Sequence, residues 1–90
     1  MRKLHLPLQV SVRRAKIEDA AAMSRVIRET LYSTNANDYP APILAGMAAR
    51  AAPTHLRRHI REDFAVVAEL EGWLVGTGML VGNEIRKLYV

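Results

Sequence analysis

Two histidines stand at a spacing that could serve a metal ion. His55 and His59 are four residues apart, a step that places two side chains on one face of a helix. A zinc site needs further ligands, and the third histidine, His5, lies far away in the sequence. No glutamate follows His55 in the arrangement that helical metalloprotease sites use. We therefore predict no metal site.

Arginines in the same region form a second group. Arg50, Arg57, Arg58 and Arg61 make a basic cluster, and the chain carries a formal net charge of +4. This balance favours anionic partners, whether nucleic acid, acidic proteins or phosphates. The cluster lacks interleaved aromatic residues and a turn between recognition helices. A solvated helix face is therefore the favoured interpretation, and nucleic-acid binding is the weaker one.

The size and composition of the chain limit its class. Ninety residues make one domain at most, and a hydrophobic content of 50% provides a core. The absence of cysteine excludes disulfides and thiolate metal sites, and we expect a cytoplasmic protein. No apolar run approaches the roughly 20 residues that span a bilayer, so no membrane partner is expected. Residues 1–8 are basic and then apolar, interrupted by Pro7, and are interpreted as a tail.

The first elements follow from hydrophobic spacing. Residues 9–14 alternate Val10 and Val12 with polar neighbours, which predicts a half-buried strand. Arg13 and Arg14 then leave the sheet, either as a solvated strand end or as phosphate contacts. Residues 18–33 predict a helix with carboxylates in its first turn. Its apolar face contains Ala22, Met23, Val26, Ile27, Thr30 and Leu31, and its solvent side contains Arg25, Arg28 and Glu29.

The middle of the chain predicts a loop and two more helices. Residues 33–42 are polar and contain two prolines, which is typical of a loop. Residues 42–52 are rich in alanine and predict a helix whose inner face holds Ile43, Leu44, Met47 and Ala48. Pro53 breaks this helix and starts a third one, residues 53–62, with Leu56 and Ile60 pointing inward.

The last third predicts three consecutive strands, residues 63–70, 73–82 and 84–90. They are joined by a Glu71-Gly72 turn and a Gly82-Asn83 corner, and so form an antiparallel meander. The middle strand alternates two sets: Trp73, Val75, Thr77, Met79 and Val81 on one side, and Leu74, Gly76, Gly78 and Leu80 on the other. Both sets are apolar or small, which predicts a strand covered on two faces.

The spacing of apolar residues in the last strand changes phase once. Ile85, Leu88 and Val90 lose their period of two around Arg86 and Lys87. Either a bulge adds one residue there, or the strand is buried on both sides near its end. The strand also ends in an apolar edge. Residues 84–90 are therefore expected to pair with a second copy, giving a homo-oligomer, or with a complementary C-terminal segment.

Three segments together resemble the first half of a GNAT-superfamily N-acetyltransferase: VSVRRAKIEDAAAMSRVIRETL, NANDYPAPILAGMAARAAPTHLRRHI and DFAVVAELEGWLVGTGMLVGNEIRKLYV. The resemblance covers roughly residues 10–90 and rests on the order and spacing of the segments. It implies a mixed α/β (α+β) domain over residues 9–90, with a strand, three helices and a three-stranded antiparallel meander. It also implies acetyl transfer from acetyl-CoA to an amine.

The resemblance assigns roles to particular residues. The backbone around Leu88, Tyr89 and Val90 would bind the cofactor by donating an N–H to the thioester carbonyl. Glu84 would be the general base, since a carboxylate beside an apolar strand has a raised pKa; its alternative is an exposed turn residue paired with Arg86 or Lys87. Tyr32 and Tyr39 would border the acceptor site, or anchor their loop to the core.

The sequence also departs from the family pattern. In that superfamily a glycine-rich loop and a helix N-terminus follow the meander and hold the cofactor pyrophosphate. Gly76-Thr77-Gly78 lies inside a predicted strand and offers no substitute. We expect the chain to be truncated before this motif and inactive alone. The alternative is a non-catalytic half-domain module that dimerises, and the weaker alternative is a basic nucleic-acid binder.

Overall fold

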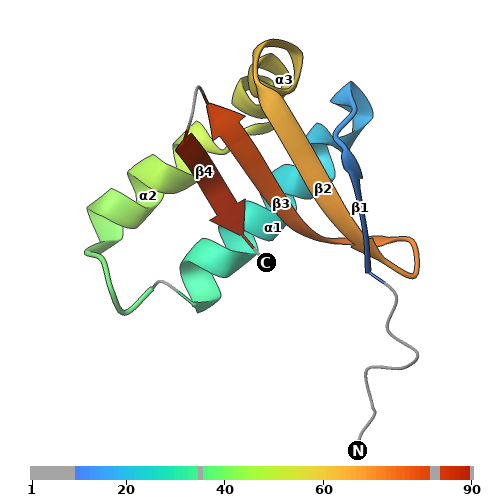
Figure 1. Cartoon of the computed structure of the whole chain (residues 1–90). Coiled ribbons are helices and arrows are strands. Elements are labelled where there is room, and N and C mark those ends of the chain that lie inside the picture. Colours follow the sequence, from blue (N-terminus) through green and yellow to red (C-terminus); the bar gives the residue numbers. More distant parts are fainter. Residues whose placement is uncertain (1–9, 35, 82–83, 90) are drawn as a thin grey trace, which may run out of the picture.

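The computed structural model describes residues 10–34, 36–81 and 84–89, without the side chains of residues 81 and 84–88. The N-terminal tail predicted for residues 1–8 lies outside this part. Figure 1 shows a sheet with helices packed behind it. The element order is strand, three helices and three strands, which confirms the predicted mixed fold.

The chain enters the sheet through β1, Val10–Arg14, and turns into the helical layer. A short 3-10 turn, Ile17–Asp19, precedes α1, Ala20–Ser33. The Asp19 carboxylate accepts a hydrogen bond from the Lys16 backbone N–H at 2.7 Å and so fixes this turn. The predicted helix at residues 18–33 is therefore right in extent, except that its first residues are wound more tightly.

Two short helices follow α1 and meet at a sharp corner. α2, Ala41–Arg50, and α3, Pro53–Glu62, both begin with proline in their first turn, where its missing N–H costs nothing. Leu56 of α3 is fully buried and Ile60 packs against the core, as predicted. In α2, Leu44 and Ala48 are buried, but Ile43 is 51% exposed. Ile43 was wrongly predicted to face inward because it lies at the border of the narrow apolar side of α2.

The four strands form one antiparallel sheet in the order β1-β2-β3-β4. β2, Phe64–Leu70, pairs with both β1 and β3, Trp73–Val81, and β4, Glu84–Tyr89, lies at the edge. Glu71 and Gly72, both with positive φ, form the tight turn between β2 and β3. The predicted meander is thereby confirmed, with β1 added as a fourth strand beside it.

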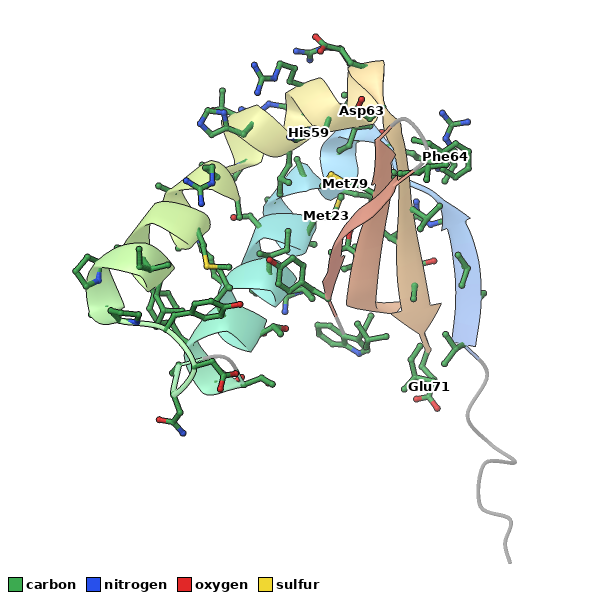
Figure 2. The ribbon with its side chains drawn as sticks, turned by 60° about the vertical axis from the view of Figure 1, so that its left-hand side comes forward. Met23, His59, Asp63, Phe64, Glu71 and Met79 are labelled. Carbon is green, nitrogen blue, oxygen red and sulfur yellow. The ribbon has the colours of Figure 1, made fainter. Side chains whose placement is uncertain are left out.

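The core lies between the helices and one face of the sheet. Figure 2 shows Met23 of α1 and Met79 of β3 meeting there, and both are almost completely buried. Val67 of β2 and Leu31 of α1 belong to the same cluster. This burial of large apolar side chains is the main stabilising contribution that the described residues offer.

The opposite face of the sheet carries no helix among the described residues. Val12 is 66% exposed and pairs with Ala68, while Phe64 points away from the helices in Figure 2. Two predictions are corrected here. β3 is covered by helices on one face only, and the valines of β1 are more than half exposed rather than half-buried. The alternation in β1 is present, but its apolar side is the uncovered one.

A further correction concerns the two arginines of β1, which stay within the sheet. Arg13 donates hydrogen bonds to Asp19 at 2.8 and 3.0 Å and to Glu69 at 3.1 and 3.3 Å. The guanidinium of Arg14 lies 4.1 Å from the centre of the Phe64 ring. Arg13 therefore has two carboxylate partners of its own, and neither arginine forms a free strand end.

Candidate functional site

The edge strand β4 contains the bulge that one interpretation of its sequence predicts. Met79 pairs with Arg86, whereas Thr77 pairs with Tyr89, so Lys87 and Leu88 lie opposite the single residue Gly78. A bulge bends the strand and redirects the peptide groups at that place. Because β4 is the last strand of the sheet, its outer backbone groups have no partner strand among the described residues. Such an edge can donate an N–H to a ligand carbonyl.

A second bulge lies in β3 and explains an error in its predicted faces. Ala68 pairs with Gly76 and Glu69 pairs with Leu74, so Val75 is an extra residue on β3. The alternation therefore changes phase at Val75, and Leu74 packs against the core from the side that also buries Thr77. The hydroxyl of Thr77 donates to the Val66 carbonyl at 3.2 Å, which satisfies this buried polar group.

Residues next to the β4 bulge leave space for a ligand to approach the open face of the sheet. A shallow, almost entirely apolar groove of about 230 Å³ runs there, bordered by Val12, Val66, Ala68, Gly76, Gly78 and Tyr89. Gly78, opposite the bulge, has no side chain to fill the space. An edge strand with unpaired peptides, beside a glycine, lets a flat ligand approach the backbone.

The phenol of Tyr89 lies in a distinct electrostatic setting. Its ring packs against the core, and burial raises its pKa because the phenolate loses water. Tyr39 raises the pKa of Tyr89 further, while the positive charge of Arg50 lowers it. Tyr39 and Arg50 are therefore electrostatic neighbours of Tyr89. The structure thus brings together two predicted site residues, Tyr39 and Tyr89.

The other predicted site residues are not assembled with these two by any described contact. Tyr32 is 53% exposed near the end of α1 and lines none of the cavities discussed. Glu84 begins β4 opposite Val81, and Leu88 lies within the bulge. The side chains of Glu84 and Leu88, and Val90 as a whole, lie outside the described residues. Their roles stay predictions.

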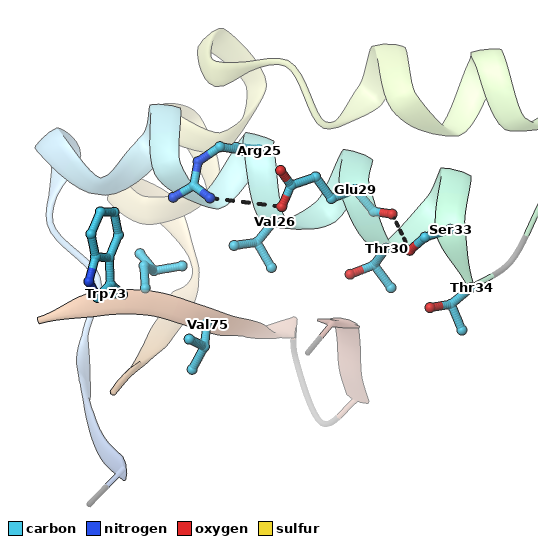
Figure 3. A pocket seen from close by; sticks show the side chains of 9 residues that line it. Arg25, Val26, Glu29, Thr30, Ser33, Thr34, Trp73 and Val75 are labelled. Atoms are coloured by element: carbon cyan, nitrogen blue, oxygen red, sulfur yellow. Dashed lines mark hydrogen bonds and ion pairs between the residues drawn. The ribbon is translucent and has the colours of Figure 1, made fainter. Parts of the chain in front are cut away.

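A second cavity was not anticipated from the sequence. It measures about 410 Å³ and lies between α1 and the first residues of β3, as Figure 3 shows. Its wall on α1 is polar: Arg25 and Glu29 form an ion pair at 3.8 Å, and the Ser33 hydroxyl donates to the Glu29 carbonyl at 2.6 Å. Trp73, 72% exposed, stands at its β3 side. Arg25 and Glu29 are exposed, as predicted, but periodicity alone did not reveal the strand end beside them.

This cavity lies beside the part of β3 that has no β4 partner among the described residues. Pairing between β3 and β4 reaches only Thr77 and Tyr89, so residues 73–76 of β3 have no β4 partner among the described residues. An exposed tryptophan directly after the β2–β3 turn is a sequence signal that could have indicated this site. The cavity can hold an extended ligand with apolar and polar sides.

Three negative observations apply to the described part of the chain. None of its three α-helices follows a glycine-rich loop, so these residues present no pyrophosphate-binding helix terminus. The Gly76–Thr77–Gly78 stretch lies in the middle of β3. No group of three or more His, Asp or Glu side chains that could hold a metal ion is present in residues 10–34, 36–81 and 84–89. None of the described helices is long and apolar enough to span a membrane.

Comparisons with known proteins identify the fold. The sequence matches no protein-family model and no curated protein. Among solved structures, it is similar to the PaiA N-acetyltransferase from Thermoplasma acidophilum, determined in complex with coenzyme A, with a TM-score of 0.77 and 21% sequence identity. The match covers 91% of this chain and 58% of that chain. The resemblance to half of a GNAT N-acetyltransferase domain is thus confirmed at the level of the fold.

Proposed function

We propose that this chain is the N-terminal part of a GNAT-type N-acetyltransferase, which transfers an acetyl group from acetyl-CoA to an amine. The observation that carries the proposal is the bulge that places Lys87 and Leu88 opposite Gly78 on an open sheet edge. The similar fold of an N-acetyltransferase solved with coenzyme A supports it. Because the sequence has no cysteine, we propose the reducing cytoplasm as its location.

The chemistry asks little of the protein, and the residues of this chain can meet the demands. Acetyl-CoA would supply an activated thioester, whose C–S bond is replaced by a C–N bond to the amine, while coenzyme A leaves as the thiol with the proton that the nitrogen loses after attack. A backbone N–H at residues 88–90 donates to the carbonyl oxygen as negative charge develops there. Glu84 takes the proton that the acceptor ammonium loses. Tyr39 and Tyr32 contact the acceptor, as the family resemblance implies.

A binding experiment that avoids the pyrophosphate tests the role of β4. S-acetylpantetheine carries the thioester and pantetheine arm alone, and we expect it to bind weakly at millimolar concentration. Amide NMR signals of residues 86–90 should shift, and those of α3 should not. Pantetheine without the acetyl group should shift the bulge amides less, because it offers no thioester carbonyl. Saturable shifts confined to other elements, or no shifts at all, would refute the proposed site.

We propose further that the chain alone is inactive. Its described helices offer no terminus for the cofactor pyrophosphate, and the chain spans 58% of the CoA-bound protein that it resembles. Calorimetric titration with acetyl-CoA should therefore give no sub-micromolar binding, and an assay of free CoA thiol should give no turnover with simple amines. A sub-micromolar dissociation constant would contradict the need for a further segment.

The occupant of the open sheet face and of the β4 edge is, in our proposal, a complementary C-terminal segment of the acetyltransferase. The apolar alternation of Val10 and Val12 on the uncovered side of β1 favours such a cover, because this pattern ordinarily marks a buried face. The same face gives support to the second candidate function, a non-catalytic module that forms homo-oligomers. Sedimentation distinguishes the two: a concentration-dependent dimer of the isolated chain supports the module, and a persistent monomer removes it.

A further inference from the structure

A small basic cavity lies at the corner between α2 and α3, apart from the groove and the α1–β3 cavity. It measures about 190 Å³ and is lined by Arg50, His55, Arg58 and His59. Arg50 is the last residue of α2, and the other three lie on α3. Arg58 and His59 follow His55 by three and four residues, so each of them is a neighbour of His55 on the helix surface. No acidic residue lines this cavity.

The corner holds these side chains close together because its backbone is anchored in the core. Ala51, between the two helices, is 1% exposed, and Leu56 is fully buried. The Ala51 N–H donates to the Ala48 carbonyl, and the Leu56 N–H donates to the Ala52 carbonyl. The chain therefore cannot separate Arg50 from α3 without exposing buried residues. Four basic groups are concentrated on a rigid support.

Most hydrogen-bond donors of these four side chains have no partner within the described part of the protein. Within the described residues, Arg50, His55 and Arg58 make no hydrogen bond or ion pair through their side chains. Arg13 differs, since it binds both Asp19 and Glu69. His59 uses Nδ1 for Asp63, at 2.7 Å, which orients the ring and leaves Nε2 for a ligand. Figure 2 shows this pair at the end of α3.

We propose that this cavity is a binding site for a phosphate group, either free phosphate or pyrophosphate, or the phosphate of a small metabolite. Two guanidinium groups can each donate paired N–H bonds to phosphate oxygens. The imidazoles of His55 and His59 add donors at the sides. The cavity is smaller than the roughly 300–1,000 Å³ of sites that enclose drug-sized ligands, and so it suits a phosphate head group.

The arginines outside the cavity make nucleic acid the less fitting ligand. Arg57 and Arg61 belong to the same helix but do not line the cavity, and Arg57 donates to the Thr54 hydroxyl at 3.4 Å. Binding along a nucleic-acid backbone would use all the arginines of α3 about equally. Binding of one phosphate group in the cavity would use Arg58 and Arg50 alone.

Pyrophosphate titrated against the 90-residue chain at low salt tests the proposal, with binding followed by calorimetry and by histidine side-chain NMR signals. Wild type should bind saturably, with shifts at His55 and His59. Arg50→Gln and Arg58→Gln should each weaken binding about tenfold, the usual effect of losing a charged hydrogen-bond donor. Arg50→Lys keeps the charge and should weaken it less than Arg50→Gln.

Arg57→Gln and Arg61→Gln are the matched controls, because each removes the same charge from the same helix. They should change the affinity by less than about twofold. Circular dichroism confirms that every variant is folded. Absence of saturable binding by wild type, or equal losses in all four glutamine variants, would overturn the proposal. So would much tighter binding of a single-stranded oligonucleotide that Arg57→Gln and Arg61→Gln abolish.

A titration with inorganic phosphate and with a phosphate monoester separates the sources of the ligand. A site for free phosphate predicts similar affinities for both. A site for a phosphorylated metabolite predicts tighter binding of some monoesters, while the Arg58→Gln loss stays about tenfold for each. A monoester that binds as tightly to Arg58→Gln as to wild type would show that its phosphate does not enter the cavity, which would count against the proposal.

Discussion

Tyr89 lies directly opposite Thr77 across the β3–β4 ladder. The bulge shifts this pairing by one residue relative to the pair Met79–Arg86. This relationship decides which side of the sheet the phenol occupies, because a shift of one residue reverses every side chain. In the observed register, the Tyr89 ring packs against the core and lies near Tyr39 and Arg50. The bulge therefore determines both the backbone groups at the open strand edge and the side of the sheet on which Tyr89 approaches Tyr39.

Deletion of Lys87 should remove the bulge and leave Tyr89 opposite Thr77, because Leu88 alone then lies opposite Gly78. The pKa of the Tyr89 phenol should therefore stay raised, since its ring keeps its place against the core. Binding of S-acetylpantetheine at the β4 amides should be lost in the same variant, because the peptide groups are no longer redirected by the bulge. Ultraviolet absorbance during alkaline titration measures the pKa, and amide NMR measures the binding. A Tyr89 pKa that falls to the ordinary value of about 10 would contradict the observed register, and unchanged binding would show that the bulge is not needed for the site.

The neighbours of Tyr89 predict opposite effects on its ionisation. Tyr39→Phe should lower the pKa of Tyr89, since it removes a group that repels the phenolate, and Arg50→Gln should raise it. Tyr32→Phe is the matched control and should leave the Tyr89 titration unchanged. Phenolate absorbance is followed in each single variant. The titration of Tyr89→Phe shows which part of the absorbance change belongs to Tyr89. Shifts of the same sign in Tyr39→Phe and Arg50→Gln would contradict this arrangement.

The raised pKa of Tyr89 also has a consequence for stability. A buried phenol favours its neutral form, so its contribution is complete below the pKa of the unfolded chain and is lost as the pH rises through the folded value. Chemical denaturation between pH 9 and 11 should therefore show a decline that is smaller in Tyr89→Phe. An equal decline in both proteins would mean that other groups cause it.

The ion pair of Arg13 with Asp19 predicts a loss of stability in acid. The pKa of Asp19 is lowered, chiefly by the hydrogen bonds from Arg13, against the opposing effect of burial and with help from the Lys16 N–H. The contribution is therefore present above the ordinary pKa of an aspartate, about 4, and is lost as the pH falls through the lower folded value. Asp19→Asn should lower the thermal midpoint at pH 7 by about 5 °C.

The exposed pair Arg25–Glu29 provides the comparison for Asp19. Glu29 is largely solvent-exposed, and its contact with Arg25 measures 3.8 Å, so Glu29→Gln should change the free energy of unfolding by less than about 0.5 kcal/mol. Thermal melts of both variants at pH 7 and pH 3 make the test. The difference between Asp19→Asn and wild type should shrink at pH 3, and a difference that persists there would contradict a charge-dependent effect.

The sequence predicted most elements because local rules and tertiary packing agree in them. Pro53 marked the start of α3 to the residue, and the phase change between Ile85 and Leu88 indicated the bulge. The faces of β3 were misjudged because a bulge at Val75 leaves no signal among residues that are all apolar or small. The partners of Arg13 could not be predicted either, since Glu69 is brought beside it only by pairing of β1 with β2.

The candidate site was harder to predict than the fold. Tyr39 and Tyr89 were singled out separately, by resemblance, and nothing in the sequence placed them near Arg50. The basic cavity shows the same limit: the histidine spacing predicted a shared helix face, but the corner that adds Arg50 depends on the burial of Ala51. Contacts between elements decide such sites, and periodicity describes only one element at a time.

The uncovered sheet face gives a last prediction about association. Val12 is 66% exposed on that face, so Val12→Lys should change the free energy of unfolding by only about 0.5 kcal/mol. It should nevertheless reduce any self-association through the face, because a desolvated lysine there has no partner. Ile43→Lys is the matched control, since Ile43 is 51% exposed on α2 and faces away from the sheet's open side. Sedimentation velocity at increasing concentration should show a lower average mass for Val12→Lys than for Ile43→Lys; equal masses for two variants of an associating chain would exclude the open face as the contact.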